Sequence, residues 1–347
     1  MLSALLKEHC LLFVLTLLTC RAEDGKIVGG YFADQSEFSF VVSVQEKSRF
    51  NSSVIYSHRC GGTLVNPWFV FTAAHCVSWR SLKNGVLHPR LAADFVVLTG
   101  TRDIKVLEPG ARFRPVDEII LNEGFREHST LTGFWLGDMA LLKLIFEVED
   151  YSFTRSVVFP REERTESQLN ELKSDKYRLC LHPGWWTGRS GVTSSPSFLK
   201  FLWMKVLPDD QCDRMFCKAY PDSCGVYNAT KLEVICALSE YQSWSPCFAG
   251  SGTPLVCDGR FFGMHVSSRY SCGMADVPEN YISVLTVRRF FRALNSYRLL
   301  NRGEQRRTSF ILFSVVMLTS IKNSKEYLEL TDSKDPTLAY VSGYSGH

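Results

Sequence analysis

Short runs of alternating apolar and polar residues restrict the fold of this 347-residue chain more than any other feature of its sequence. A period of two places every second side chain on the same face of a β-strand, so one face can be buried while the other meets solvent. Four such runs stand between polar turns: Phe38 to Val44, Phe95 to Leu98, Met139 to Leu144 and Leu199 to Val206. They predict an all-β protein built as a sandwich or a barrel.

A tight hairpin and one helix are predicted in the second half of the chain. Asp258-Gly259 separates two short apolar runs, and this pair accepts the positive φ values that a two-residue turn requires. Further on, apolar residues recur at helical spacing after Thr286, the expected N-cap, which predicts a helix over about 286–300. The charged stretch 160–176 has few apolar residues and is interpreted as a solvated linker between two halves.

The chain begins with the features of a secretory signal peptide. The apolar run Leu11 to Thr19 ends in Cys20-Arg21-Ala22, which predicts a cleaved leader over residues 1–22. An uncleaved membrane anchor is the alternative, but the run is well short of the roughly 20 apolar residues that span a bilayer. Cys10 and Cys20 leave with the leader, so ten of the twelve cysteines remain. Five disulfides are then possible in an oxidising compartment, and we expect a secreted, extracellular protein.

Charge and residue spacing indicate no nucleic-acid, membrane or metal partner. A net charge of +3 is too small to indicate nucleic acid or an acidic membrane as partner, and no basic stripe interleaved with aromatic residues occurs. The sequence has no His-x-x-x-His pair and no zinc-type Cys-x-x-Cys doublet, so neither a metal nor a cofactor is expected.

Two smaller features bear on the surface and on the tail. Asn51 and Asn228 begin Asn-x-Ser/Thr sequons, which predict glycosylated surface loops. The tail 301–347 contains an apolar segment, 309–321, whose thirteen residues are few for a membrane span. We expect an amphipathic or loosely packed tail, of unknown role, rather than a membrane helix.

Three separated segments carry the groups that acyl transfer needs. His75 stands beside Cys76, Asp138 heads an apolar strand, and Ser251 lies between two glycines. A serine hydroxyl is a poor nucleophile until an imidazole accepts its proton, and that imidazole needs a carboxylate to fix its tautomer and stabilise its charge. Each residue alone also fits an ordinary structural role, but together they predict a catalytic triad.

These motifs resemble those of the trypsin/chymotrypsin-like serine peptidases. The similarity runs over 27–300 and rests on five segments: Ile27 to Gly30, Cys60 to Leu64, Thr72 to Cys76, Asp138 to Leu142, and Ser251 to Leu255. The resemblance implies two six-stranded antiparallel β-barrels with an active cleft between them and a C-terminal helix. His75 and Asp138 would come from the first barrel, about 27–155, and Ser251 from the second, about 175–285.

The same resemblance implies further roles. It assigns Ser267 as the serine that hydrogen-bonds the triad aspartate. It makes residues 23–26 a short activation peptide, cut between Lys26 and Ile27, so the protein would be a zymogen that needs an activating protease. It also implies the disulfides Cys60–Cys76, Cys180–Cys257, Cys212–Cys236 and Cys247–Cys272, which leaves Cys217 and Cys224 to bridge each other.

The segment around Ser251 departs from the family pattern Gly-Asp-Ser-Gly-Gly-Pro at Ala249, Gly250 and Thr253. In the family, the amine freed by activation pairs with the aspartate before the serine and shapes the oxyanion hole. Gly250 offers no carboxylate to the Ile27 amine, and a buried ammonium without a partner is costly. Ala249 and Ser251 would supply the oxyanion-hole N–H groups, and the methyl group of Ala249 is expected to crowd the substrate or misdirect its own N–H.

The specificity pocket departs from the family as well. Ser245 stands where trypsin-type members carry aspartate, so a preference for Arg or Lys is not expected. Arg269 and Glu279 occupy wall positions that are usually small. Either they form a salt bridge that partly fills the pocket, or Glu279 itself meets a basic side chain of the substrate.

Two functions follow from these residues. The first is a secreted serine endopeptidase that acts on protein or peptide substrates, in which His75 assists the attack of Ser251 and Asp138 orients His75. The second is a non-catalytic homologue that keeps the fold to bind a protein partner or to regulate other proteases. The complete triad favours the first function, and the changes at 249, 250 and 269 favour the second.

Overall fold

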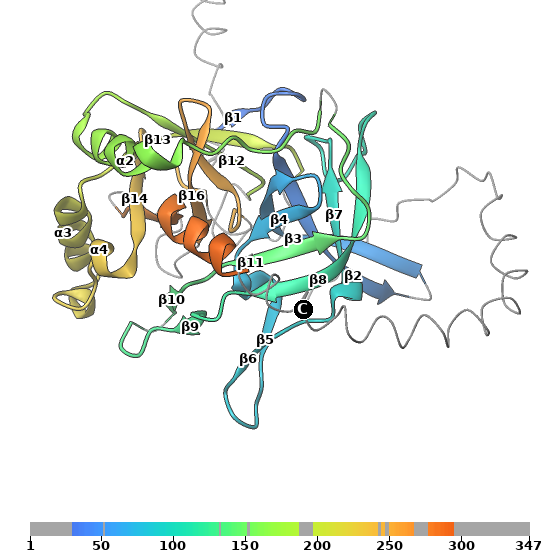
Figure 1. Cartoon of the computed structure of the whole chain (residues 1–347), viewed down its shortest axis with the longest axis horizontal. Coiled ribbons are helices and arrows are strands. Elements are labelled where there is room, and N and C mark those ends of the chain that lie inside the picture. Colours follow the sequence, from blue (N-terminus) through green and yellow to red (C-terminus); the bar gives the residue numbers. More distant parts are fainter. Residues whose placement is uncertain are drawn as a thin grey trace, which may run out of the picture. The chain divides into compact units, whose positions relative to one another are not determined.

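The computed structural model describes residues 30–50, 53–131, 133–150, 153–186, 197–241, 244–246, 250–266 and 277–294. The predicted leader, the activation site and the tail lie outside these residues. The contacts divide the chain into one unit over 1–288 and a second over 289–347, of which 289–294 are described. The first unit contains the β-strands that form the fold (Figure 1).

Six antiparallel strands close the first barrel in the order β11-β4-β3-β2-β7-β8. The circle is complete because β11 pairs with β4 on one side and with β8 on the other. The side chains of Val42 and Val44 are fully buried in it, as the alternating pattern predicts. The strands are β2 (Val41–Phe50), β3 (Ser53–Asn66), β4 (Phe69–Thr72), β7 (Phe95–Thr99), β8 (Arg112–Leu121) and β11 (Ala140–Leu144).

A second barrel follows the order β13-β12-β15-β16-β17-β14 and closes where β14 pairs with β13. Two closed six-stranded antiparallel barrels confirm the predicted fold class. The strands are β12 (Cys180–Gly184), β13 (Lys200–Val206), β14 (Val234–Ser239), β15 (Pro254–Cys257), β16 (Arg260–Val266) and β17 (Glu279–Ser283).

The first strand of the chain, β1 (Tyr31–Phe32), does not join the first barrel. It pairs with β13 and extends the sheet of the second barrel. Residues 35–40 form turns, so the strand predicted to start near Phe38 begins only at Val41. Phe38 is nevertheless buried, in a cluster with Trp185 and Leu199. Phe38 is buried by residues distant in the sequence although it lies in a turn, so the alternating pattern predicted a strand that starts too early.

The predicted hairpin at Asp258-Gly259 is confirmed. β15 and β16 pair directly across it, with Cys257 opposite Arg260. The φ angles of the two turn residues are 50° and 70°, both in the left-handed region.

The stretch 160–176 connects the two barrels and is mostly exposed, as predicted for a solvated linker, but it also contains helix α2 (Thr165–Ser174), which was not expected. Leu169 and Leu172, three positions apart, lie on one face of that helix and are buried. Two apolar residues at helical spacing were enough to anchor a segment whose other side chains are mostly polar.

The predicted C-terminal helix is present over 284–294, and residues 295–300 lie outside the described part. The helix starts before Thr286, so Thr286 is not its N-cap. The Thr286 hydroxyl instead donates to Glu233 at 3.1 Å. No helix in the described part of the chain is long and apolar enough to cross a membrane.

Two helices, α3 (Asp209–Ala219) and α4 (Ala229–Leu232), lie between β13 and β14 in the sequence. In α4 the Asn228 side chain accepts a hydrogen bond from the Lys231 N–H at 2.8 Å and caps the helix. Glycosylation of Asn228 stays a prediction, and Asn51 lies outside the described residues. The remaining elements are the paired short strands β5 (Ser78–Arg80) with β6 (Leu87–Pro89) and β9 (Arg126–Glu127) with β10 (Trp135–Leu136).

Four of the five implied disulfides are formed among the described residues: Cys60–Cys76, Cys180–Cys257, Cys212–Cys236 and Cys217–Cys224. Cys247 and Cys272 lie outside those residues, so their bridge stays a prediction.

The Cys180–Cys257 bridge is expected to contribute most to stability, since its cysteines are 77 positions apart. Replacing both by alanine should lower the free energy of unfolding by about 4 kcal/mol, because the unfolded chain regains the entropy of an open loop. Urea denaturation of the wild type and of the double variant measures this. The matched control is the pair Cys217 and Cys224, only 7 positions apart. Replacing this pair should lower the free energy of unfolding by less. Equal losses would contradict the loop argument.

Candidate active site

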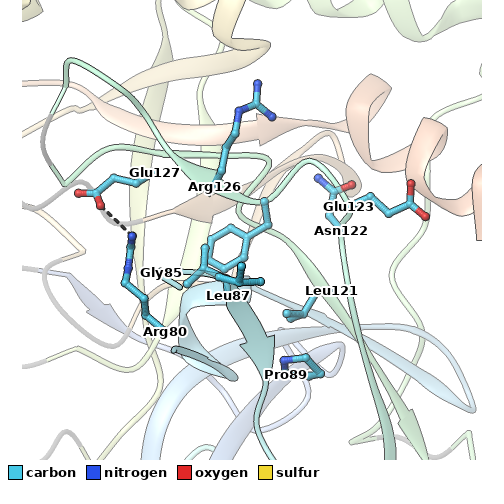
Figure 2. Close-up of a pocket in the computed structure, with 11 residues that line it drawn as sticks. Arg80, Gly85, Leu87, Pro89, Leu121, Asn122, Glu123, Arg126 and Glu127 are labelled. Atoms are coloured by element: carbon cyan, nitrogen blue, oxygen red, sulfur yellow. Dashed lines mark hydrogen bonds and ion pairs between the residues drawn. The ribbon is translucent and has the colours of Figure 1, made fainter. Parts of the chain in front are cut away.

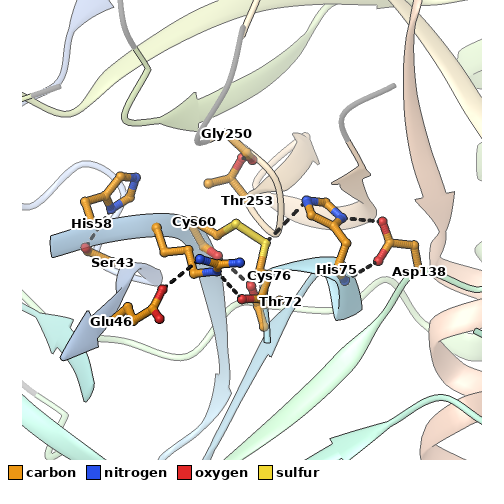
Figure 3. The surroundings of a disulfide bond; sticks show 12 residues. Ser43, Glu46, His58, Cys60, Thr72, His75, Cys76, Asp138, Gly250 and Thr253 are labelled. Carbon is orange, nitrogen blue, oxygen red and sulfur yellow. Dashed lines mark hydrogen bonds and ion pairs between the residues drawn. A yellow bond between two sulfur atoms is a disulfide. The ribbon is translucent and has the colours of Figure 1, made fainter. Parts of the chain in front are cut away.

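Strand pairing brings His75 and Asp138 together, although they are 63 positions apart. His75 lies in the 3₁₀ helix Ala74–Cys76 just after β4, and Asp138 lies just before β11, the partner strand of β4. Asp138 Oδ2 is 2.6 Å from His75 Nδ1, and Oδ1 accepts the main-chain N–H of His75 at 2.8 Å (Figure 3). The two contacts orient the imidazole and assign its proton to Nδ1.

Gly137, immediately before Asp138, has a φ of +57°, in the left-handed region that favours glycine. A Cβ at Gly137 would lie only 2.4 Å from Asn122 Nδ2. The same Asn122 amide donates to the Gly137 carbonyl at 2.9 Å. Asn122 therefore fixes the segment that carries the buried carboxylate.

Burial of His75 would by itself lower the pKa of its imidazole. The Asp138 carboxylate opposes this through its charge and its hydrogen bond, and the pKa of His75 is raised above the ordinary value although the Arg59 charge acts to lower it. The side chain of Asp138 is 1% exposed and that of His75 is 28% exposed. The imidazole thus has a buried partner on one side and access to solvent on the other.

His75 Nε2 lies 3.5 Å from Sγ of Cys76, which is bonded to Cys60 (Figure 3). A disulfide sulfur has no proton to donate, so an unprotonated Nε2 keeps its lone pair available for a hydroxyl. Ligand atoms of Cys60, His75 and Cys76 lie within 4.8 Å of one another. Metal binding needs thiolates, and both sulfurs are in the disulfide, so these residues do not form a metal site.

Ser251 lies in the turn 250–253, which we call the nucleophile turn, directly before β15. Ser251 is 2% exposed. The Gly252 N–H donates to the His265 carbonyl of β16 at 2.8 Å, and the Gly252 carbonyl accepts from the Thr63 hydroxyl of β3 at 3.0 Å. The nucleophile turn is therefore tied to one strand of each barrel.

Gly252 has a φ of +90°, and a Cβ there would lie 2.4 Å from the Gly61 carbonyl oxygen. Any other residue at 252 would be strained in its backbone and would displace β3. The glycine after Ser251 thus allows the close approach of the nucleophile turn to the first barrel.

Thr253, one of the three positions expected to depart from the family pattern, is fully buried. Its hydroxyl donates to the Gly250 carbonyl at 2.6 Å and lies 3.3 Å from His182 Nε2. Its methyl group occupies the space beside Gly61, where an added Cβ would lie 2.1 Å from it. The role of Thr253 was not predicted, although a polar, branched residue beside Gly250 and Gly252 was a visible signal.

Two of the predicted pocket residues, Ser245 and Glu279, do meet. The Ser245 hydroxyl donates to Glu279 Oε1 at 2.6 Å, and His265 Nε2 lies 3.1 Å from Glu279 Oε2. All three residues are buried. His265 was not predicted, although a histidine in the apolar strand β16 was a visible signal. Arg269, the other expected partner of Glu279, lies outside the described residues.

His182 of β12 is a second buried histidine that sequence reasoning missed. Its Nδ1 lies 3.0 Å from the Tyr281 hydroxyl, and its ring packs edge-on against the His265 ring with centroids 4.9 Å apart. Burial, together with nearby His265, lowers the pKa of His182 well below its ordinary value. Burial and the Glu279 charge raise the pKa of Tyr281. Both side chains are therefore neutral near pH 7.

A cleft of about 550 Å³ opens beside the segment that leads to Asp138 (Figure 2). It lies between the β5–β6 hairpin and residues 121–127. Arg80 pairs with Glu127 at 2.8 Å on its wall, and Asn122 lines it as well. Asn122 also donates to the Gly137 carbonyl, so one residue of the cleft wall contacts the residue before Asp138.

Several predicted residues lie outside the described part of the chain, so their roles stay predictions. They are Lys26, Ile27, Asn51, Cys247, Ala249, Ser267, Arg269 and Cys272.

Two closed antiparallel barrels, with a histidine–aspartate pair on the first and a serine turn on the second, are the architecture of a trypsin-like serine peptidase. The sequence model described as Trypsin matches residues 27–290. The chain belongs to the trypsin family.

Curated relatives agree with this assignment. The chain is 29% identical to trypsin from Sus scrofa over 262 residues, which cover 76% of this chain and 92% of that protein. It is 27% identical to cationic trypsin-3 from Rattus norvegicus, over 76% of this chain and 86% of that protein. It is also 27% identical to serine protease 1 from Rattus norvegicus, over 76% of this chain and 87% of that protein.

Proposed function

We propose that the chain is a secreted serine endopeptidase whose triad is Ser251, His75 and Asp138. The observation that carries this proposal is the pair of hydrogen bonds by which Asp138 orients His75. His75 Nε2 accepts the Ser251 proton as the serine oxygen attacks the substrate carbonyl, and then gives the proton to the leaving amine. Water, activated by the same imidazole, releases the acyl group and restores Ser251.

The oxyanion of the intermediate would be held by the N–H groups of Ala249 and Ser251. Loss of one such donor costs roughly 100- to 1000-fold in turnover. We propose slow catalysis, since the methyl group of Ala249 is expected to crowd the substrate or to misdirect its own N–H.

Hydrolysis of a fluorescent-labelled protein substrate by the purified secreted chain tests the proposal, with Ser251→Ala as its matched control. We expect slow hydrolysis by the wild type and none above background by the variant. Equal rates would assign the activity to a contaminant, and an inert, folded wild type would favour the non-catalytic homologue.

We further propose secretion with a cleaved leader, glycosylation at Asn51 and Asn228, and activation by a protease between Lys26 and Ile27. Disulfides are typical of oxidising compartments, and four are formed among the described residues. The N-terminal residue of the protein recovered from culture medium tests both cleavages.

The rate constant kcat/KM is expected to rise with pH through a midpoint above about 6.5, the ordinary histidine value. The pKa of His75 is raised, and at a pH below that pKa the imidazole is protonated and cannot accept the Ser251 proton, so activity increases as the pH rises. Arg59→Gln should move the midpoint upward, because the Arg59 charge lowers that pKa. Arg59→Lys keeps the charge and is the control. A downward shift in Arg59→Gln would contradict the assignment of His75 as the base.

Substrate preference is expected to differ from that of trypsin. Ser245 supplies no charge, and both oxygens of Glu279 are engaged by Ser245 and His265. A peptide-library profile should therefore not be dominated by Arg or Lys before the cleaved bond. Dominance that disappears in Glu279→Ala would instead show that Glu279 receives the basic side chain.

A further inference from the structure

A chain of hydrogen bonds runs from the second barrel into the nucleophile turn. Thr253 has a single hydroxyl proton, and its 2.6 Å contact directs that proton to the Gly250 carbonyl. The 3.3 Å contact between Thr253 and His182 Nε2 must then be an N–H donated by the imidazole. His182 Nδ1 is left unprotonated and accepts from the Tyr281 hydroxyl at 3.0 Å. Every donor in this series has an acceptor, in one direction.

The protonation states of the buried groups agree with that direction. The chain needs a neutral His182 and a neutral Tyr281, and the lowered pKa of the first and the raised pKa of the second provide both. In a cationic His182, Nδ1 would also carry a proton. The Nδ1–H and the Tyr281 O–H would then be two donors facing each other, and the hydrogen bond in this direction would be lost.

The space around Gly250 is enclosed by the same histidines. A Cβ at this residue would lie 2.9 Å from the Pro246 carbonyl oxygen and 3.5 Å from both His182 Nε2 and His265 Nδ1. His265 Nδ1 is buried, and it has no hydrogen-bond partner within the described ranges. The groups nearest to a Cβ at residue 250 would thus be a carbonyl and two imidazole nitrogens.

We propose that Thr253 and His182 are positioning residues that hold the nucleophile turn in its working shape before any cleavage at Lys26. The proposal rests on the proposed function, since it concerns the turn that carries Ser251. On one side of Ser251, the Thr253 hydroxyl donates to the carbonyl of Gly250. On the other side, the main-chain carbonyl of His265 accepts the N–H of Gly252. A turn fixed on both sides of its serine does not need a new amine to order it, so the proposed activating cleavage after Lys26 would act on parts of the site other than this turn.

The test compares two forms of the protein: the full chain with Lys26→Gln, which blocks cleavage there, and a chain that begins at Ile27. Hydrogen exchange, resolved to single amides, is followed at Gly252 and Thr253. We expect slow exchange in both forms, with rates that agree within about twofold. Thr253→Val keeps the side-chain shape but removes the hydroxyl, and should speed exchange at least about fivefold in both forms, the equivalent of one net hydrogen bond.

Thr253→Ser is the matched control, because it keeps the hydroxyl and should restore slow exchange. Urea denaturation of both variants separates local opening from loss of the fold. Thr253→Val should also lower kcat more than it changes KM. Exchange that is fast in the uncleaved chain and slows only in the Ile27 form would overturn the proposal, and so would a Thr253→Val protein indistinguishable from wild type.

Hydrolysis measured on the same samples separates this proposal from the peptidase proposal. A protected turn in both forms without hydrolysis in either sinks the peptidase and supports the internal positioning of the turn. Hydrolysis and protection that both appear only in the Ile27 form support the peptidase and sink the internal positioning.

Discussion

Asp138→Asn is expected to lower kcat by about four orders of magnitude, the loss known for triads of this type when the carboxylate becomes an amide. Asp138 uses both oxygens, one for His75 Nδ1 and one for the His75 main-chain N–H. An asparagine has only one oxygen to accept, so one of the two contacts must be lost or reversed. If the amide N–H faces Nδ1, the imidazole proton moves to Nε2, where the base must be free.

Initial rates on one peptide substrate measure this effect. Asp117→Asn is the matched control, because Asp117 is an exposed aspartate that pairs with Lys143 at the surface, and it should change kcat by less than about twofold. An Asp138→Asn protein that keeps a tenth or more of wild-type activity would show that His75 does not depend on Asp138.

Glu279→Leu is expected to lower the free energy of unfolding by about 1–3 kcal/mol for each buried polar neighbour that loses its hydrogen-bond partner. The carboxylate accepts from Ser245 and faces His265 Nε2, and all three residues are buried. Leucine would leave both neighbours without this partner. Adding His265→Leu should cost less than the sum of the single changes, since the two side chains interact directly.

Urea denaturation at pH 7 checks these values. The control is Asp210→Ala, which breaks the exposed pair of Asp210 with Arg214 and should lower the free energy of unfolding far less, because exposed ion pairs contribute little to stability. A Glu279→Leu loss as small as that of the control would contradict a stabilising role for the buried carboxylate.

Features encoded by neighbouring residues could be predicted well from the sequence. The Asp258-Gly259 turn, the strand alternation at Val42 and Val44, and the motif around His75 each depend on a few adjacent positions. The pairing of His75 with Asp138 was also expected, because the resemblance supplied the long-range contact. Helix α2 was missed, because only Leu169 and Leu172 marked its buried face.

The network under the nucleophile turn could not be predicted in the same way. His182 and Thr253 are 71 positions apart, and His182 and Tyr281 are 99 apart. Each is a single polar residue in an apolar strand or a glycine-rich turn, and only closure of the second barrel brings them together. Gly250 showed that a carboxylate was absent, but nothing local showed that two imidazoles would surround its position.

A serine-directed phosphonate, followed by mass spectrometry, tests the central claim that Ser251 is a working nucleophile. The wild-type protein should carry one adduct, located on Ser251. His75→Ala should react far more slowly, and Ser251→Ala should carry no adduct. A folded wild-type protein that stays unmodified, beside a trypsin sample that is fully modified, would contradict the claim.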